Sequence, residues 1–367
     1  MSRFWRHPLT LRALYAAAMG RAALRWYNPR RRAQDRHRVG FYESAWREAA
    51  EELGATFRPL GGGIAEIALD EHHTRVVENT CAIDDPVTLA VLSDKVLTHR
   101  IVSAEGVPVP RHLAFRFKEL HKAIDFLRST ASDCVVKPAA GTGGGRGVTT
   151  GIRTPRHLAG AAASAAVYTD DLLIEEQIEG DNYRLLYLDG ELVDAFVRRP
   201  PTVVGDGKST VARLVRQAND QRLRGRAGVS QVQLTVDPDM RRTLARQNLT
   251  LRSVPPAGAT VVLKTVVNEN AGADNTTATG VLCDAIVDEC ARAVKALRVR
   301  LAGVDVITRN PKLPLRESGG VVLEVNAPPN FYYHYHKCDG VYPVAKHVLR
   351  KLLLDRIPTE AEVADAR

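Results

Sequence analysis

The hydrophobic and polar positions of this chain follow two periods in alternating blocks. Apolar residues recur every three to four positions between residues 42 and 53, which predicts a helix that ends at Gly54. Residues 57–69 and 74–79 alternate with a period near two around a run of glycines, which predicts short strands joined by a turn. The pattern therefore predicts a small N-terminal lobe of one helix and a sheet.

Strand and helix patterns also alternate through the rest of the chain. Apolar runs at residues 172–178, 184–188 and 191–197 flank tight turns and predict one antiparallel sheet. Residues 301–307 and 321–331 predict two further strands. The expected fold class is therefore α/β, built as α+β lobes. Helices are expected from Ser93 to Gly106 and at residues 120–129, 210–223, 240–247 and 284–297.

One predicted strand opens into a loop that is rich in glycine and in positive charge. Residues 135–147 read VVKPAAGTGGGRG, so that Lys137 precedes the glycines and Arg146 lies among them. Glycine lets backbone N–H groups point at a phosphate without obstruction. The loop lacks the Lys-Ser/Thr of a Walker loop and the setting of a dinucleotide-binding loop. It indicates a phosphate-binding lid, with a mobile surface loop as the alternative; its glycines are Gly141, Gly143, Gly144, Gly145 and Gly147.

Three oxygen-bearing side chains lie in the last two predicted strands. Asp305 interrupts the apolar run 301–307, and Glu324 and Asn326 follow each other on one side of the next strand. An acid within an apolar strand is costly unless it is paired or bound to a metal. Carboxylate and amide oxygens suit Mg²⁺, which binds few protein ligands and also contacts nucleotide phosphates. Each acid alone is explained as well by an ordinary ion pair, but the set and the glycine loop together point to a nucleotide site.

These features together resemble the ATP-grasp superfamily of carboxylate–amine ligases, and most of all the ATP-grasp portion of the cyanophycin synthetases. The resemblance runs with gaps from about Asp84 to about Asn326. Besides the loop and the acidic strands it includes the stretches LSDKVLTHRIVSAEGVPVP (92–110), LLIEEQIEGDNYRLLYLDGELV (172–193), RRPPTVVGDGKST (198–210) and SVPPAGATVVL (253–263). It implies an ATP-grasp fold, an enzyme that forms carbon–nitrogen bonds with release of ADP, and the cofactors ATP and Mg²⁺, with Mn²⁺ as a second option.

The resemblance also assigns roles to single residues. It implies that Lys95 and Lys137 hold the phosphates and the adenine edge, and that the loop 141–147 closes over the phosphates. The hinge beside adenine is then Glu175, Glu176 and Ile178, and the ribose contact falls on Asn182, where the family usually has an acid. Asp305, Glu324 and Asn326 match the metal ligands. Catalytic cations near the acyl phosphate or the substrate are Arg184, Arg199 and Lys264.

The chain departs from the cyanophycin synthetases in ways that concern the substrate. No Mur-ligase-like domain fits in the residues that follow Asn326. The segment 268–280 differs in length and composition from its counterpart, and NFYYHYH (330–336) replaces small residues after the metal motif. In that region His334, His336 and Cys338 share one face if the segment is a strand. A wall of the substrate pocket, plain packing and a zinc site are the three explanations, in decreasing order of preference.

The positive charge of the chain lies in one segment. The whole sequence carries a formal charge of +9, and residues 1–38 hold ten arginines and a single acid, Asp35, so that the remainder is neutral. Residues 11–26 could form an amphipathic helix, but its arginines exclude a membrane span. Packing on the body or on a second subunit is the favoured explanation. Contact with nucleic acid or a membrane, and a floppy leader, remain as alternatives.

The cysteine content favours a reducing, cytoplasmic location. Five cysteines without a CxxC motif are expected to be free thiols. The predicted division is a basic extension (1–38), a small N-terminal lobe (39–92), an ATP-grasp domain (93–355, with lobes 93–170 and 171–355) and a tail (356–367). We expect small-molecule or peptide carboxylate and amine substrates and a homodimer. The alternatives are a phosphotransferase that acts on a hydroxyl and a non-catalytic protein that binds nucleotides or anionic surfaces.

Overall fold

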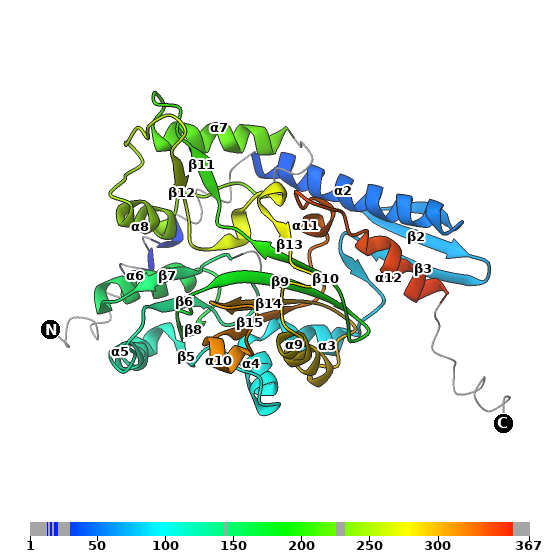
Figure 1. Ribbon diagram of the computed structural model, residues 1–367, viewed down its shortest axis with the longest axis horizontal. Coiled ribbons are helices and arrows are strands. Elements are labelled where there is room, and N and C mark those ends of the chain that lie inside the picture. The colour runs from blue at the N-terminus through cyan, green and yellow to red at the C-terminus, as the bar shows by residue number, and fades with distance from the viewer. Residues whose placement is uncertain are drawn as a thin grey trace.

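The computed structural model describes residues 13, 15–16, 18–20, 30–142, 145–224 and 232–354. Figure 1 shows an N-terminal helix and sheet on one side, a second sheet with two helices on the other, and a third sheet between them. The predicted helix 11–26 is described only in part: Ala13, Tyr15, Ala16 and Ala18–Gly20 are helical. Tyr15 lies beside Phe117, with 6.1 Å between the ring centroids. Among the described residues, none of the helices is long and apolar enough to cross a membrane.

The N-terminal lobe is a four-stranded antiparallel meander that two helices cover. The sheet order is β1-β2-β3-β4, and Trp46 of the first helix and Ile67 of the sheet are fully buried in the shared core. The last helix, which the sequence assigns to the ATP-grasp domain, contributes Val348 and Leu349 to the same core. His72, expected in a turn, begins a strand. The elements are α2 (Arg30–Glu52), β1 (Thr56–Gly61), β2 (Ile64–Leu69), β3 (His72–Val77), β4 (Thr80–Cys81) and α12 (Val344–Leu353).

A second antiparallel sheet carries the glycine loop. Its order is β5-β8-β6-β7, and two helices cover one face through an apolar core that includes Val136, Ile174 and Phe115. The glycine loop joins β6 to β7. The elements are β5 (His112–Arg116), η2 (Phe117–Glu119), α5 (Leu120–Arg128), β6 (Cys134–Pro138), β7 (Thr149–Ile152), α6 (Pro155–Ala165) and β8 (Asp171–Glu176).

The third sheet carries the acidic strands. Its order is β13-β10-β9-β14-β15, and Leu185, Val304 and Val306 on one face pack with the longest helix beside it. The elements are α3 (Pro86–Ser93), α4 (Lys95–Ala104), β9 (Asp181–Leu188), β10 (Glu191–Arg198), β13 (Thr276–Thr277), α9 (Asp284–Ala296), β14 (Leu301–Thr308), α10 (Leu315–Ser318), β15 (Val321–Asn326) and α11 (Tyr332–Tyr335).

The prediction of a single sheet across residues 172–197 is wrong. β9 and β10 form the expected hairpin, but β8 pairs with β5 and β6 in the other sheet. The chain leaves one sheet after Glu176 and enters the next at Asp181. Gly180 allows this crossing, because a Cβ there would lie 2.4 Å from the backbone of Thr308. The connection therefore joins the two sheets.

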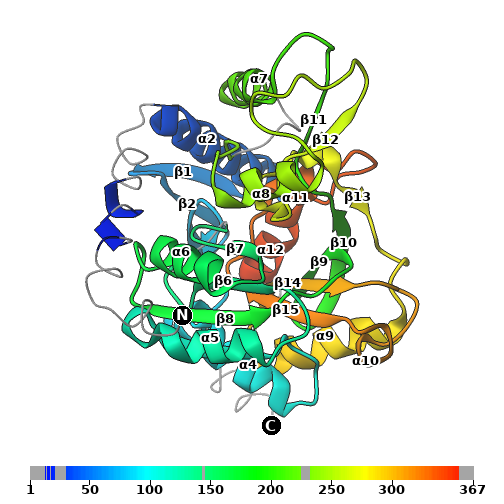
Figure 2. The same ribbon diagram turned by 90° about the vertical axis from the view of Figure 1, so that its left-hand side faces the viewer.

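A small subdomain is inserted between β10 and β13. Two short strands and two helices enclose their own apolar core, which includes Val211, Met240 and Leu263. Figure 2 shows this unit at one edge of the molecule, with α7 outermost. The elements are β11 (Thr202–Val204), α7 (Val211–Leu223), α8 (Pro238–Arg246), β12 (Thr260–Val262), η3 (Val267–Glu269) and η4 (Gly272–Asp274).

Candidate active site

Strand alternation gives the glycine-loop sheet one apolar face and one polar face. Glu175 on β8 lies opposite Val135 on β6 and His112 on β5. Lys137, two residues beyond Val135, shares that face. The alternate residues face α5 and α6. Lys137 and Glu175 are both buried and form an ion pair of 2.8 Å on the polar face.

The third sheet repeats this arrangement. Asp305 on β14 lies opposite Arg184 on β9 and opposite Glu324 on β15, so that all three side chains share one face. Arg184 lies opposite Phe196 on β10, and Arg198 follows two residues later on the same face. The opposite face is apolar and is covered by α9. The charged residues occupy one end of their face, and at its other end Leu186, Leu188 and Leu301 pack against α12.

Asp305 is the centre of a buried charge cluster. Arg184 donates two hydrogen bonds to its carboxylate, with Nε–Oδ1 at 2.6 Å and Nη2–Oδ2 at 2.9 Å. Nη1 of Arg198 lies 3.4 Å from each carboxylate oxygen, and Nδ2 of Asn326 donates to Oδ2 at 3.3 Å. Burial alone would raise the pKa of Asp305, but the two guanidinium groups hold it below its ordinary value. The carboxylate is therefore ionised at neutral pH.

Helix α4 brings the two polar faces together. Its first residue, Lys95, forms an ion pair of 3.1 Å with Glu324 of β15. The backbone N–H of Lys95 donates to Ala139, which directly follows β6. Asp94 caps the helix by accepting from the N–H groups of Val96 and Leu97. Lys95 thus lies between the start of the glycine loop and the acidic strands.

The glycine loop has the backbone that its composition predicts where it is described. Gly141, Gly145 and Gly147 have φ angles of 72°, 72° and 77°, which glycine adopts without strain. A Cβ on Gly147 would lie 2.9 Å from the ring of Pro138. Gly143 and Gly144 lie outside the described residues. The loop therefore needs glycine for conformation and, at Gly147, for close packing as well.

The remaining predicted residues occupy several positions. Asn182 lies on β9 with the parity of Arg184, and its Oδ1 is buried without a hydrogen-bond partner. Glu176 pairs with Arg111 at 3.2 Å, and Ile178 lies half-buried in the connection between the two sheets. None of these three touches the Asp305 cluster through a contact that the structure describes.

Two of the predicted cations are also outside the cluster. Arg199 forms an ion pair with Asp181, and both side chains are about half exposed. Lys264 is buried in the inserted subdomain, where Nζ lies 2.7 Å from Asp237 and 2.8 Å from Glu269. Burial would lower the pKa of Lys264, but these carboxylates raise it. Both of its neighbours are therefore engaged in holding the subdomain together.

Sequence reasoning missed Arg198, which lies where Arg199 was expected. The two arginines are adjacent, so only one can lie on the cleft face of a strand. The register of β10 against β9 selects Arg198, which is 5% exposed. A bulge between Leu192 and Asp194 shifts that register by one residue. The alternation of Asp194, Phe196 and Arg198 could have indicated Arg198. The bulge, however, interrupts the alternation earlier in the same strand.

The residues present fit a nucleotide and a divalent cation. Asp305, Glu324 and Asn326 offer three hard oxygen donors on two paired strands. Glu175 Oε2, Asn182 Oδ1 and His99 Nδ1 are buried polar atoms without a partner, and they come from elements that border both polar faces. Such orphaned atoms are unusual unless a ligand satisfies them. Among the described residues, no group of three or more His, Cys, Asp and Glu side chains could hold a metal.

The His334, His336 and Cys338 set does not share a strand face. Residues 332–335 form helix α11, because β15 has ended at Asn326. His334 is fully buried, and its Nδ1 lies 2.7 Å from Asp194, whereas Cys338 is exposed. Nζ of Lys337 lies 2.5 Å from the same carboxylate. The zinc alternative is therefore excluded, and His334 is anchored beside the charged face.

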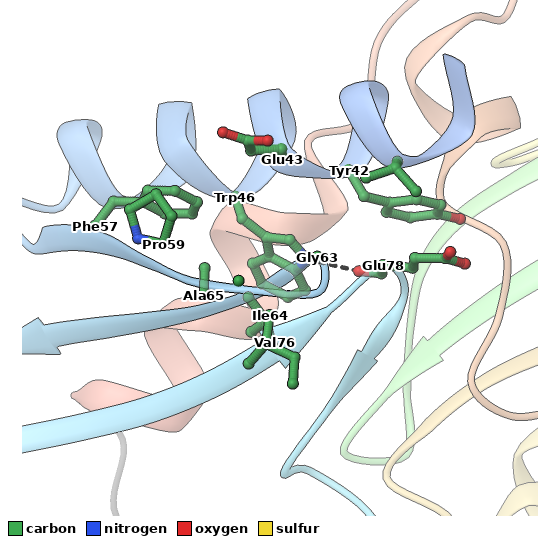
Figure 3. Close-up of a pocket in the computed structure, with 12 residues that line it drawn as sticks. Tyr42, Glu43, Trp46, Phe57, Pro59, Gly63, Ile64, Ala65, Val76 and Glu78 are labelled. Atoms are coloured by element: carbon green, nitrogen blue, oxygen red, sulfur yellow. Dashed lines mark hydrogen bonds between the residues drawn. The ribbon is translucent and has the colours of Figure 1, made fainter. Parts of the chain in front are cut away.

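A cavity of ≈ 210 Å³ lies away from these residues, in the N-terminal lobe. Figure 3 shows it between α2 and the hairpin of β1 and β2, with Trp46 at its centre. The indole N–H of Trp46 donates to the backbone oxygen of Glu78 at 2.7 Å. The cavity contains none of the predicted site residues, so the candidate site is the charged cleft rather than this apolar pocket.

Known proteins match this chain over most of its length. It is 34% identical over 296 residues to cyanophycin synthetase of Nostoc sp. (strain PCC 7120), which covers 80% of this chain and 32% of that protein. It is 31% identical over 291 residues to the glutathione biosynthesis bifunctional protein GshAB of Enterococcus faecalis, covering 76% and 36%. The chain thus spans about a third of the length of these curated relatives. No protein-family profile matches it.

A solved structure extends the comparison to the fold. The bifunctional glutathione synthetase from Pasteurella multocida superimposes with a TM-score of 0.53 at 23% sequence identity. The alignment covers 82% of this chain and 41% of that one. The likeness therefore extends to the fold of most of the chain.

Proposed function

We propose that this chain, which is an ATP-grasp protein related in sequence to the cyanophycin synthetases, is an ATP-dependent carboxylate–amine ligase. The observation that supports this proposal best is the Asp305 cluster. Two buried guanidinium groups and Lys95 share one sheet face with two carboxylates and an amide. A net positive site of this kind suits the transfer of a phosphoryl group to a carboxylate and the later departure of phosphate.

The reaction would take place in two steps on the same face. A substrate carboxylate oxygen attacks the γ-phosphorus of ATP, and the bond to the β-phosphate oxygen breaks, which gives an acyl phosphate and ADP. An amine nitrogen then attacks the acyl carbon, inorganic phosphate leaves, and the nitrogen loses its proton. The product is an amide. No oxidant or reductant is required.

The chain's own residues would bind and orient these groups. Lys137 lies near the end of β6, Lys95 lies beside Ala139 directly after it, and both would contact the phosphates in exchange for their present carboxylate partners. Arg184 and Arg198 would hold the transferred phosphoryl group and the oxyanion. The loop 141–147 would exclude water, which otherwise hydrolyses an acyl phosphate.

Asp305, Glu324 and Asn326 would hold a divalent cation. Mg²⁺ in this position supplies charge neutralisation between the phosphates. Asp305 lies between two arginines and would share its charge between them and the cation. Glu324 is half-buried and its partner Lys95 has a flexible stem, so this pair can separate at lower cost.

The substrates are proposed to be an amino acid or a short peptide. The names of the relatives, cyanophycin synthetase and a glutathione biosynthesis protein, refer to peptide-like products of those proteins. Aromatic side chains lie beside the charges of this chain. Tyr332 and Tyr333 are buried beside Phe196 on the sheet face that carries the charges.

The test is ADP release measured against a panel of amino acids and short peptides with Mg²⁺. A ligase should release ADP when a carboxylate and an amine are both present, and hydroxylamine should replace the amine by trapping the acyl phosphate as a hydroxamate. ADP release with a hydroxyl compound alone would make the protein a phosphotransferase. ATP-analogue binding without any ADP release across the panel would leave only a binding function.

A further inference from the structure

One buried carboxylate connects the nucleotide side of the cleft with the inserted subdomain. Asp239 is the second residue of α8 and is 2% exposed. Its Oδ1 accepts hydrogen bonds from the hydroxyl of Thr150 on β7 at 2.5 Å and from the hydroxyl of Thr265 at 2.8 Å. The two hydroxyl oxygens are 2.6 Å apart. Three side chains from three segments therefore lie in mutual contact, and the two hydroxyl protons fill two of the three short contacts at a time.

The second oxygen of Asp239 holds the backbone of the segment that follows β12. Oδ2 accepts from the N–H of Thr265 at 3.1 Å and lies 3.4 Å from the N–H of Val266. Asp239 does not cap its own helix, because Asp237 fills that role by accepting from Met240. All of the described hydrogen bonds of the Asp239 carboxylate are made to other segments, and Arg242 of its own helix interacts with it electrostatically. The hydrogen bonds offset the cost of burying the carboxylate and hold those segments together.

A second contact fixes the same two elements at close range. Gly151 follows Thr150 on β7 and has a φ of 67°. A Cβ at this position would lie 1.9 Å from Nη2 of Arg246 at the end of α8. Arg246 in turn donates to Asp133, one residue before β6, at 3.2 Å. Helix α8 therefore contacts the glycine-loop sheet at both of its ends.

The two joined segments belong to different halves of the proposed reaction. β7 directly follows the glycine loop and pairs with β6, which carries Lys137. Thr265 leads toward residues 268–280, which the resemblance to the cyanophycin synthetases assigns to the substrate side. Lys264, beside Thr265, is anchored to Asp237 at the start of α8. Asp237 and Asp239 at the start of α8 thus bind Lys264 and Thr265, which lead toward the substrate-side segment.

We propose that Asp239 is a positioning residue that makes the glycine-loop strand and the substrate-side segment move as one body. The inference rests on the proposed function, because it takes the nucleotide to be the ligand that orders the glycine loop. Ordering of β7 would be passed through Thr150 and Asp239 to Thr265. The carboxylate and amine would then be positioned only when the nucleotide is bound. Coupling between two such sites typically changes an equilibrium by roughly 5- to 150-fold.

Hydrogen exchange tests this coupling without knowledge of the substrates. The probe is a non-hydrolysable ATP analogue with Mg²⁺, added to the full chain. In the wild type we expect slower exchange in β6, β7 and β8, and also at least ~5-fold slower exchange in α8 and residues 260–266. Thr150→Val keeps the shape of the side chain and removes the hydroxyl. In this variant the slowing should persist in β6 and β8 but fall below ~2-fold in α8.

Matched variants separate coupling from a structural role. Thr150→Ser retains the hydroxyl and should restore the slowing in α8. Arg241→Gln, on the exposed side of the same helix, should behave as the wild type. Loss of structure alone would speed exchange in α8 equally with and without the analogue and leave the ratio unchanged, which would overturn the proposal. Thr265→Val is a second variant if Thr150→Val does not fold, and it should lose the slowing in residues 260–266.

The outcomes also distinguish this proposal from the proposed function. No slowing in β6 and β8 of the wild type would mean that the nucleotide does not bind in the cleft, and the proposed function would fail. Slowing in β6 and β8 with no change in α8, or with the same change in wild type and Thr150→Val, would leave the nucleotide site in place and refute the coupling through Asp239.

Discussion

The adjacent arginines 198 and 199 allow a direct test of the cleft geometry. Arg198 is buried and lies 3.4 Å from both oxygens of Asp305, whereas Arg199 is about half exposed and pairs with Asp181 on the surface. The two substitutions, Arg198→Gln and Arg199→Gln, remove the same charge one residue apart. Only the first removes a cation from the face that is proposed to hold the phosphoryl group.

The expected magnitudes follow from these surroundings. Loss of one preorganised cation at a developing charge typically costs about 100-fold in kcat, or about 2.7 kcal/mol of barrier. The fold should tolerate Arg198→Gln, because Arg184 still pairs with Asp305 through two shorter hydrogen bonds. We expect a loss of about 1–2 kcal/mol in unfolding free energy. Arg199→Gln should change stability by at most about 1 kcal/mol, as is typical of exposed ion pairs, and should leave kcat within about threefold of the wild type.

The assay is steady-state ADP release with the substrates that the panel identifies, together with urea unfolding of each variant. Equal loss of activity in both variants would show that the register of β10 does not decide which arginine acts. Arg198→Gln with more than a third of wild-type kcat would remove Arg198 from the reaction. A larger loss of stability than of activity would make Arg198 a structural partner of Asp305 rather than a catalytic group.

Three further predictions concern the metal, pH and the basic extension. Glu324→Gln should lower ADP release at least ~100-fold with a stability change of about 1 kcal/mol. Asp305→Asn should also destabilise the fold by about 3–5 kcal/mol, because it leaves two buried guanidinium groups without their anion. Near-wild-type turnover of either variant at saturating Mg²⁺ would remove the substituted residue from the metal site. The pKa values of Asp305 and Asp194 lie below the ordinary value. Both carboxylates therefore stabilise the fold above their unfolded pKa of about 4 and lose this contribution as the pH falls through their folded pKa values. An unfolding free energy that stays constant from pH 6 to pH 3 would contradict this. Removal of residues 1–29, which precede α2, should leave ADP release largely intact. It should change oligomerisation or solubility, since most of the excess positive charge lies there. A truncated protein that is folded by circular dichroism but inactive would place the extension in the active site.

The sequence predicts the position of a side chain well where that position depends on alternation within one strand. The positions of Asp305, Glu324 and Lys137 follow from alternation within single strands, and the structure places each on a polar face, as that alternation requires. The sequence does not predict positions that depend on how strands pair with one another. The crossing of the chain at Gly180 separates β8 from β9 although their patterns match, and the bulge in β10 exchanges Arg198 for Arg199.

Lys264 illustrates a third kind of limit. The family resemblance implied a cation near the acyl phosphate or the substrate, and in the structure Asp237 and Glu269 approach Lys264 from other segments. These carboxylates are 27 and 5 residues away in sequence, and no local pattern announces that they will meet the same lysine. The fold of the inserted subdomain thus decides the role of a residue that its own neighbours leave undefined.

The packing of α12 on α2 has a consequence for folding during synthesis. The core around Trp46 needs Val348 and Leu349 from a helix that follows nearly all of the described chain. During synthesis, the apolar side of α2 therefore emerges from the ribosome long before the residues that complete its core. The two ATP-grasp sheets can begin to form in that interval, whereas the N-terminal lobe must wait. We infer that nascent chains expose this lobe to chaperones and proteases for longer than the sheets that follow it, and that the last residues of α12 complete a core whose first helix was translated long before.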